Sequence, residues 1–232
     1  MAQYLIEFRF QSKRIRSYIK GIIHELNKKF RVGKRKHIPH ITLIGPIVTN
    51  NEKRLVSDFA KICSQTKLMK FKGKGFGTFD NNKVVFVNIV PDEKFNEFRI
   101  KLSQKLKEYC KLPAHNKRKE KEKFGYHSTL AMKLNANEFN SIKNYIKNKP
   151  APDFTQRVMR VTLLKGGRIL REYDFLQRRL LNRKQSLNKN ITRRSKTLLK
   201  RFIQGNKQKS KVKPIIRKKE ILSKIKSWLG LK

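Results

Sequence analysis

The chain has 232 residues, of which 59 are Lys or Arg and 16 are Asp or Glu, so its formal net charge is +43. This length allows one large domain, or one domain with an extension, and is sufficient to bury a core. No run reaches the roughly 20 apolar residues of a membrane-spanning helix, and residues 1–10 lack a signal peptide's apolar core. The cationic excess favours polyanionic partners: RNA, DNA or an anionic membrane.

The two cysteines, Cys63 and Cys110, bear on the compartment and on covalent cross-links. They are too few and too widely spaced for a disulfide scaffold or a cysteine-based zinc site. We therefore expect a soluble, cytoplasmic protein, and a monomer. The high basicity has a second interpretation, because a source organism rich in lysine would shift the charge of every protein surface.

The first part of the chain predicts a strand followed by an amphipathic helix. Residues 4–10 alternate between apolar and polar side chains, as a strand does. Ser12 offers a side-chain cap to a helix that we expect to run to about Phe30. Its apolar stripe consists of Ile15, Ile19, Ile22, Ile23 and Leu26. A basic loop at 33–36 then leads into a short apolar strand that contains His40.

The middle of the chain predicts a helix, a hairpin and a second helix. Asn50 or Asn51 can begin the first helix, which turns Leu55, Phe59 and Ile62 inward. Residues 69–79 and 83–90 read as two strands joined by a turn at 80–82. The alternating glycines of the first strand, Gly73, Gly75 and Gly77, predict bulges or close packing. A long helix should follow from residue 91 to about Cys110.

The last part of this region repeats the same pattern. After a basic loop at 111–123, a second apolar strand contains His127. Asn135 or Asn137 caps a helix that ends before Pro150, and residues 154–164 and 168–176 form two strands around a Gly-Gly turn. The duplicated order predicts an α+β fold of two pseudo-symmetric lobes, with mainly antiparallel sheets, outer helices and a central cleft.

Composition changes at about residue 181. Residues 182–232 are dense in Lys and Arg and contain a single acidic residue, Glu220. We therefore expect a bilobal domain over 1–181 and a basic tail over 182–232 that is partly helical or disordered. Residues 191–204 and 219–231 are its candidate helices. The second of these is basic and amphipathic, so it could lie on a membrane, follow RNA or dock on the protein itself.

Both apolar strands with a histidine contain the same short motif. His40-Ile41-Thr42-Leu43 and His127-Ser128-Thr129-Leu130 each have a His, a spacer, a Thr and a Leu. Because side chains alternate across a strand, each His shares a face with its Thr. Two such strands side by side would offer two imidazoles and two hydroxyls to one cavity. The pairing favours a functional site, because a lone histidine on an apolar strand is usually a core residue.

These residue types suit acid–base chemistry on a phosphate. One histidine can take a proton from the nucleophile and the other can give one to the leaving oxygen. The Thr hydroxyls can donate to non-bridging oxygens, where negative charge builds up. No acidic cluster or Cys/His ligand set accompanies the pair, so we expect a metal-free mechanism without cofactors. The alternative is a metal bound by His37 and His40, whose side chains would face opposite ways on a strand.

The paired motifs and the order of elements over about residues 1–181 resemble the two-histidine (2H) phosphoesterase superfamily. The 2′-5′ RNA ligase and RNA 2′,3′-cyclic phosphodiesterase branch is the nearest group. The resemblance implies two pseudo-symmetric lobes and metal-independent action on 2′,3′-cyclic phosphates or 2′-5′ linkages. It implies that His40 and His127 are the catalytic acid–base pair and that Thr42 and Thr129 hold the phosphate. Gly77-Thr78-Phe79 and residues 83–86 also resemble the family's central hairpin.

The chain departs from the family pattern after the second motif. Many members continue with Ala-Arg, whereas this chain has Ala131-Met132, so a basic group must come from elsewhere, with Lys133 and Lys123 as candidates. Tyr126 and Phe79 are candidate platforms for stacking on a base, with core packing as the alternative for each.

Three functions remain open at this stage. The first is a phosphoesterase that hydrolyses 2′,3′-cyclic phosphate at RNA ends, with 2′-5′ ligation as a related reaction. The second is a non-catalytic, basic RNA-binding or ribosome-associated protein whose motif pair is vestigial. The third is a peripheral membrane protein that uses residues 219–231.

Overall fold

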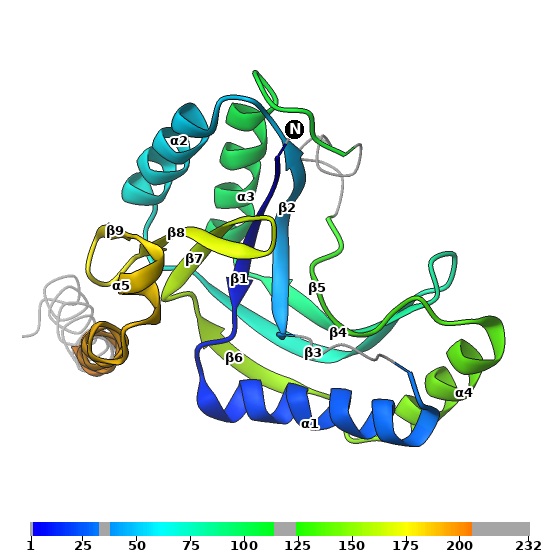
Figure 1. The fold of residues 1–232 in the computed structure, drawn as a ribbon. Coiled ribbons are helices and arrows are strands. Elements are labelled where there is room, and N and C mark those ends of the chain that lie inside the picture. The colour runs from blue at the N-terminus through cyan, green and yellow to red at the C-terminus, as the bar shows by residue number, and fades with distance from the viewer. Residues whose placement is uncertain (1, 33–37, 114–123, 206–232) are drawn as a thin grey trace, which may run out of the picture. The chain divides into compact units, whose positions relative to one another are not determined.

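The computed structural model describes residues 2–32, 38–113 and 124–205 (Figure 1). The chain divides into two compact units, Met1–Leu187 and Asn188–Lys232. The first unit is an α+β fold with two antiparallel sheets, as the sequence predicts. It extends past residue 181, the boundary expected from composition, because the short helix α5 (Arg183–Leu187) contacts two strands of the first sheet.

The first sheet carries the His40 motif at its edge. Its strands are all antiparallel to their neighbours and follow the order β2-β1-β7-β8-β9. The bounds are Gln3–Arg9 for β1, His40–Val48 for β2, Arg160–Lys165 for β7, Arg168–Asp174 for β8 and Arg179–Leu181 for β9. The motif strand β2 therefore has β1 as its one partner in the sheet.

The second sheet is built in the same way and carries the His127 motif at its edge. Its order is β5-β4-β3-β6, again with antiparallel neighbours. The bounds are Lys70–Phe79 for β3, Val84–Pro91 for β4, His127–Ala131 for β5 and Asp153–Arg157 for β6. The motif strand β5 has β4 as its sheet partner, just as β2 has β1.

Helices cover both sheets (Figure 1). The helices α1 (Lys13–Phe30) and α4 (Ala136–Lys147) contact each other, and they contact β5 and β3–β4 of the second sheet respectively. The helices α2 (Glu52–Gln65) and α3 (Glu93–Leu106) pack on each other and contact the first sheet, α2 at β8 and α3 at β2.

The helix starts follow the caps that the sequence predicts. The Ser12 hydroxyl accepts a hydrogen bond from the Ile15 amide, and the Asn51 side chain accepts one from Arg54. Asn135 and Glu138 form a reciprocal capping box. The end of α3 differs from the prediction, since the α-helix stops at Leu106 and the chain continues to Cys110 in turns.

The strand predicted over residues 154–164 is wrong in one respect, because it is two strands that belong to different sheets. The chain passes from β6 to β7 through Val158 and Met159, which are both buried. The Val158 amide donates to the Met69 carbonyl, and the Phe175 amide donates to the Met159 carbonyl. The sequence predicts one strand here because the stretch contains no turn residues. Backbone hydrogen bonds to two different segments hold Val158 and Met159 where the chain passes from one sheet to the other.

The core is one continuous apolar cluster that reaches both sheets. Aromatic rings join the sheets directly: Phe8 of β1 meets Phe71 of β3 edge-on at a centroid distance of 5.0 Å. Phe10 meets the ring of Phe154, on β6, at 6.1 Å. Because side chains alternate along β1, the face opposite Phe8 is left to Glu7 and Arg9. That second face is where the candidate site lies.

Candidate active site

The two motif strands lie side by side. β2 is the edge of the first sheet, β5 is the edge of the second, and the two strands contact each other. Residues separated by more than eighty positions in the sequence are thereby placed in one region of the fold. The sequence predicts this arrangement from the repeated motif alone.

Burial alternates identically along the two motifs. In β2, His40 and Thr42 are half-buried, while Ile41, Leu43 and Ile44 are buried. In β5 the same order holds, with His127 and Thr129 half-buried and the residues beside them buried. Each histidine therefore shares an accessible face with its threonine, and the spacer side chain goes into the core, as the period of a strand requires.

Both imidazoles are held by the same kind of contact. Nδ1 of His40 lies 2.9 Å from the Ile38 carbonyl oxygen, and Nδ1 of His127 lies 2.8 Å from the Gly125 carbonyl oxygen. A carbonyl can only accept a hydrogen bond, so each Nδ1 must carry the proton. In the neutral ring Nε2 is then the basic nitrogen, and in the charged ring it is a second donor. The two histidines thus present Nε2 for proton transfer.

The partner strand gives His40 a charged neighbourhood. In the β1–β2 register, Arg9 is opposite His40 and Glu7 is opposite Thr42, so all four side chains leave the sheet on one face. The buried Glu7 carboxylate accepts a hydrogen bond from Nε of Arg9, and its Oε2 lies 3.8 Å from Nε2 of His40. No pattern in the sequence assigns Glu7 or Arg9 to the site. Alternation within residues 4–10 shows that they share a face, but not which strand they lie beside.

A buried polar row continues behind Glu7 across the first sheet. Glu7 is in register with Thr162 of β7, which is in register with Glu172 of β8. Glu172 accepts hydrogen bonds from Thr162 and from Arg160, and Arg160 also donates to Asp174. Burial raises the pKa of Glu172, and the charge of Arg160 opposes that rise. The face that carries His40 is therefore polar and internally paired along several strands.

His127 has aromatic neighbours where His40 has charged ones. In the β4–β5 register, Phe86 is opposite Thr129 and Asn88 is opposite His127. The ring of His127 meets Phe79 edge-on at a centroid distance of 4.9 Å and lies 5.2 Å from Phe86. Phe79 and Phe86 lie 4.4 Å apart. The two lobes thus match in backbone design and differ in the chemistry beside each imidazole.

Gly77 makes this aromatic arrangement fit. A Cβ at position 77 would lie 2.4 Å from the ring of Phe86, its partner across the β3–β4 ladder. The close-packing interpretation of the glycines is confirmed here, and the register shift between Gly73 and Phe76 confirms a bulge. The absent side chain at Gly77 lets Phe86 lie over β3 and against His127.

The two aromatic stacking candidates are placed differently. Tyr126 is only 3% exposed, packs edge-on against Phe95 and donates a hydrogen bond from its hydroxyl to Asn96. Its ring offers no face to a base, and burial raises the pKa of its hydroxyl. Phe79 is half-buried and lies beside His127. Of the two, Phe79 remains the candidate.

Of the two candidate basic groups near the second motif, Lys133 lies within the described residues. Met132 is 47% exposed, and Lys133 follows it with a left-handed backbone at φ 59°. Lys123 and His37 lie outside the described residues. The cation that the register does bring to the motif face is Arg9, opposite His40.

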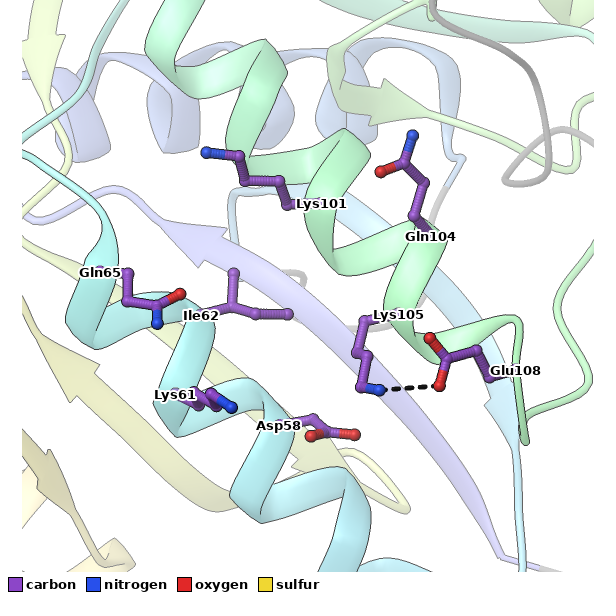
Figure 2. A pocket seen from close by; sticks show the side chains of 8 residues that line it. All are labelled: Asp58, Lys61, Ile62, Gln65, Lys101, Gln104, Lys105 and Glu108. Atoms are coloured by element: carbon purple, nitrogen blue, oxygen red, sulfur yellow. Dashed lines mark hydrogen bonds and ion pairs between the residues drawn. The ribbon is translucent and has the colours of Figure 1, made fainter.

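A separate hollow lies on the outer side of the first unit, between α2 and α3 (Figure 2). Charged side chains of both signs line it, and Lys105 pairs there with Glu108 at 2.7 Å. None of the four motif residues lines this hollow.

Across residues 2–32, 38–113 and 124–205, no three His, Cys, Asp or Glu side chains are grouped as metal ligands would be. In the same residues, no helix has the length and apolar character needed to cross a bilayer.

Comparison with solved structures places this fold among known proteins. The protein TT0787 of Thermus thermophilus is 14% identical and matches with a TM-score of 0.51 over 75% of this chain and 97% of its own. Escherichia coli LigT in apo form is 17% identical, with a TM-score of 0.46 over 71% of this chain and 86% of its own. LigT complexed with 3′-AMP is also 17% identical, with a TM-score of 0.47 over 78% and 94% of the respective chains. No curated protein sequence matches the chain.

The sequence itself carries the family assignment. Residues 12–169 match the profile of the 2′-5′ RNA ligase superfamily. The matched segment includes both motif strands, β2 and β5, together with the hairpin of β3 and β4. Because the match extends over more than half of the sequence and agrees with the two-lobed fold, the chain belongs to the 2′-5′ RNA ligase superfamily.

Proposed function

We propose that this chain is a metal-independent phosphoesterase that hydrolyses 2′,3′-cyclic phosphate at RNA ends with two histidines. Membership of the superfamily supports an RNA end-processing enzyme of the phosphoesterase and ligase class. The observation that carries the finer proposal is the matched pair of motif strands. They contact each other, and in each strand Nδ1 of the histidine lies against a backbone carbonyl, which makes Nε2 the nitrogen that exchanges a proton.

The unlike surroundings of the two imidazoles suggest their roles. The Glu7 carboxylate lies 3.8 Å from Nε2 of His40, so a negative group stands beside the nitrogen that would give a proton to the leaving oxygen. The rings of Phe79 and Phe86 lie beside His127, the imidazole that would take a proton from water. We therefore assign His40 as the acid and His127 as the base.

The reaction then balances with one water molecule. Nε2 of His127 takes a proton from water while the water oxygen bonds to phosphorus. The bond from phosphorus to one ribose oxygen breaks, and Nε2 of His40 gives its proton to that oxygen. The product is a terminal phosphomonoester; His127 has gained a proton from water and His40 has lost one to the ribose oxygen. With a ribose 5′-hydroxyl in place of water as the nucleophile, the 3′ oxygen leaves and takes the proton, and the same step gives ligation through a 2′-5′ linkage.

Thr42 and Thr129 fit the binding of the phosphate. Each lies on the accessible face next to its histidine, and a hydroxyl there can donate to a non-bridging oxygen. Arg9 adds a positive charge on the His40 side, in the role for which the sequence suggested Lys133 or Lys123. Phe79 supplies a partly open ring on the His127 side, where the base of the terminal nucleotide can stack.

The test of the function is turnover of a 2′,3′-cyclic nucleotide in the presence of a chelator. We expect His40→Ala and His127→Ala each to lower kcat by about 10²–10⁴-fold. His24→Ala is the matched control, since His24 is exposed on α1. Full activity in both motif variants would refute the two-histidine mechanism. Absence of turnover in the wild type, combined with strong and salt-dependent RNA binding, would instead support a non-catalytic RNA-binding protein.

The role assignment needs a substrate whose leaving group requires no proton. Bis(4-nitrophenyl) phosphate releases a nitrophenolate, so its hydrolysis depends on the base and not on the acid. We expect His40→Ala to keep most of its activity on this ester and His127→Ala to lose it. The opposite pattern would exchange the two roles while leaving the two-histidine mechanism intact.

A further inference from the structure

The second unit contributes a helix that the catalytic proposal does not use. Residues 189–205 are helical, and the Asn188 side chain caps the helix by accepting hydrogen bonds from the amides of Asn190 and Ile191. This confirms the helix predicted over residues 191–204. The segment lies beyond the family match at residues 12–169, so the family fold does not account for it.

The basic residues of this helix all lie on its exposed surface. All of its cationic residues are exposed: Lys189, Arg193, Arg194, Lys196, Lys200 and Arg201. Ser195 is the one buried side chain of the helix, while Ile191, Leu198 and Leu199 are half-buried. A helix that buries only a serine adds little to an apolar core. Its basic side is therefore unexplained by packing.

Four of the basic residues form one line along the helix. Lys189, Arg193, Lys196 and Lys200 are spaced by four, three and four positions, so they lie on the same face. We call these four residues the basic stripe. At 1.5 Å per residue it is about 16 Å long, which is about the length of five phosphates in a stacked strand at 3.4 Å each.

The stripe is unfavourable for the helix by itself. Lys189 with Arg193, and Lys196 with Lys200, are like-charge pairs four residues apart, which destabilise a helix. Residues 188–205 include no Asp or Glu to compensate. By contrast, the exposed basic side chains of α1 share that helix with Glu25, which pairs with Lys149. A bound row of anions would remove the repulsion along the stripe.

We propose that the basic stripe binds the phosphate backbone of the RNA substrate outside the catalytic site. This inference rests on the proposed function for the identity of the polyanion, and it makes the substrate an RNA strand rather than a free cyclic nucleotide. RNA fits better than a membrane. An amphipathic helix on a membrane must insert its apolar side, and here Ile191, Leu198, Leu199 and Ile203 are already half-buried, which leaves Phe202, 42% exposed, as the one large exposed apolar residue among residues 189–205.

The test measures binding of a single-stranded 20-nucleotide RNA with a 3′-hydroxyl end, which contains no cyclic phosphate, by fluorescence anisotropy over a range of salt. The variant is the full chain with Lys189, Arg193, Lys196 and Lys200 all changed to Gln, a good helix former. At about 0.7 per neutralised phosphate, we expect the slope of log K against log salt to become shallower by about 3.

Two comparison variants separate the stripe from general basicity and from misfolding. In one, four exposed basic residues of α1 are changed to Gln: Lys13, Arg14, Arg16 and Lys20. An equal loss of slope in this variant would overturn the proposal, because the stripe would then have no special role. In the other, Lys and Arg are exchanged within the stripe, which keeps the charge and should keep the slope near that of the wild type.

Turnover distinguishes this inference from the proposed function. We expect the stripe variant to keep its kcat/KM on a 2′,3′-cyclic mononucleotide and to lose about tenfold or more on a 20-nucleotide RNA that ends in a cyclic phosphate. Absence of turnover in the wild type would refute the proposed function and leave the binding result standing. Unchanged RNA binding combined with lost binding to phosphatidylserine vesicles would overturn the stripe proposal in favour of a membrane.

Discussion

Glu7 places its Oε2 atom 3.8 Å from Nε2 of His40, and its other carboxylate oxygen accepts a hydrogen bond from Arg9. The equivalent position in the other lobe, opposite Thr129, holds Phe86. The two lobes therefore repeat a backbone plan and differ where a carboxylate faces one histidine and an aromatic ring faces the other. The two motif histidines therefore have chemically different neighbours, which is the basis of the different roles proposed for them.

Glu7→Gln should slow the reaction that needs an acid. The amide keeps the size of the side chain and removes the negative charge that lies 3.8 Å from Nε2 of His40, so we expect kcat on a 2′,3′-cyclic nucleotide to fall roughly ten- to a hundredfold. Turnover of bis(4-nitrophenyl) phosphate should change much less. Glu97→Gln, which alters an exposed carboxylate on α3, is the control. An equal fall on both substrates would mean that Glu7 only supports the fold.

Gly77→Ala should damage stability and catalysis together. The added Cβ would lie 2.4 Å from the Phe86 ring, which must then shift against His127. We expect the free energy of unfolding to fall by about 1–3 kcal/mol, as overpacking does, and kcat to fall as well. Thermal unfolding and steady-state kinetics measure the two effects.

Gly73→Ala is the matched comparison for that variant. Its Cβ would lie 2.3 Å from the ring of Phe154, which belongs to the core rather than to the motif face. It should lower stability similarly while the folded enzyme keeps its kcat. If both glycine variants lost kcat to the same degree, the Phe86 ring would have no particular role beside His127.

Phe79→Ala should weaken the binding of a base. A stacked base is worth about 1–3 kcal/mol, so we expect KM for a cyclic nucleotide to rise by about five- to a hundredfold with a smaller change in kcat. Tyr126→Phe removes the hydrogen bond to Asn96 and should lower stability without changing KM. Unchanged KM in Phe79→Ala would assign that ring to packing.

The ion pair at Glu52 predicts how stability depends on pH. Lys165 and Tyr4 both donate hydrogen bonds to Glu52, and these contacts lower its pKa in the folded protein. The stabilisation is present above the carboxyl's ordinary pKa and is lost as pH falls through the lowered value. The difference in Tm between wild type and Glu52→Gln should therefore shrink between about pH 6 and pH 3.

Local features of the fold could be predicted from the sequence because they depend on neighbouring residues. The cap at Ser12, the capping residue Asn135 and the turn between β3 and β4 each involve residues within a few positions of one another. The shared face of His40 and Thr42 is local in the same sense, since strand alternation fixes it. The duplicated motif extended this to the contact between two distant strands, β2 and β5.

What could not be predicted depends on contacts between distant residues. Residues 154–164 are strand-forming throughout, and only the backbone bonds of Val158 and Met159 to two different segments reveal the change of sheet. Glu7 and Arg9 belong to the site because β1 pairs with β2 in one register, and no short-range pattern specifies that register. The two histidines could therefore be predicted from the sequence, but the difference between their neighbours could not.

The change of sheet between β6 and β7 also sets the order in which the protein can assemble. β1 pairs with β7 as well as with β2, so the pairing of residues 3–9 is complete only after residues 160–165 have been synthesised. Pairings with such long sequence separation close large loops and slow the folding of a chain. During synthesis, the hairpin of β3 and β4 can form early, whereas the sheet behind His40 is completed near the end. The sheet that carries His40 therefore gains its inner strand, β7, only after both motif strands have been synthesised.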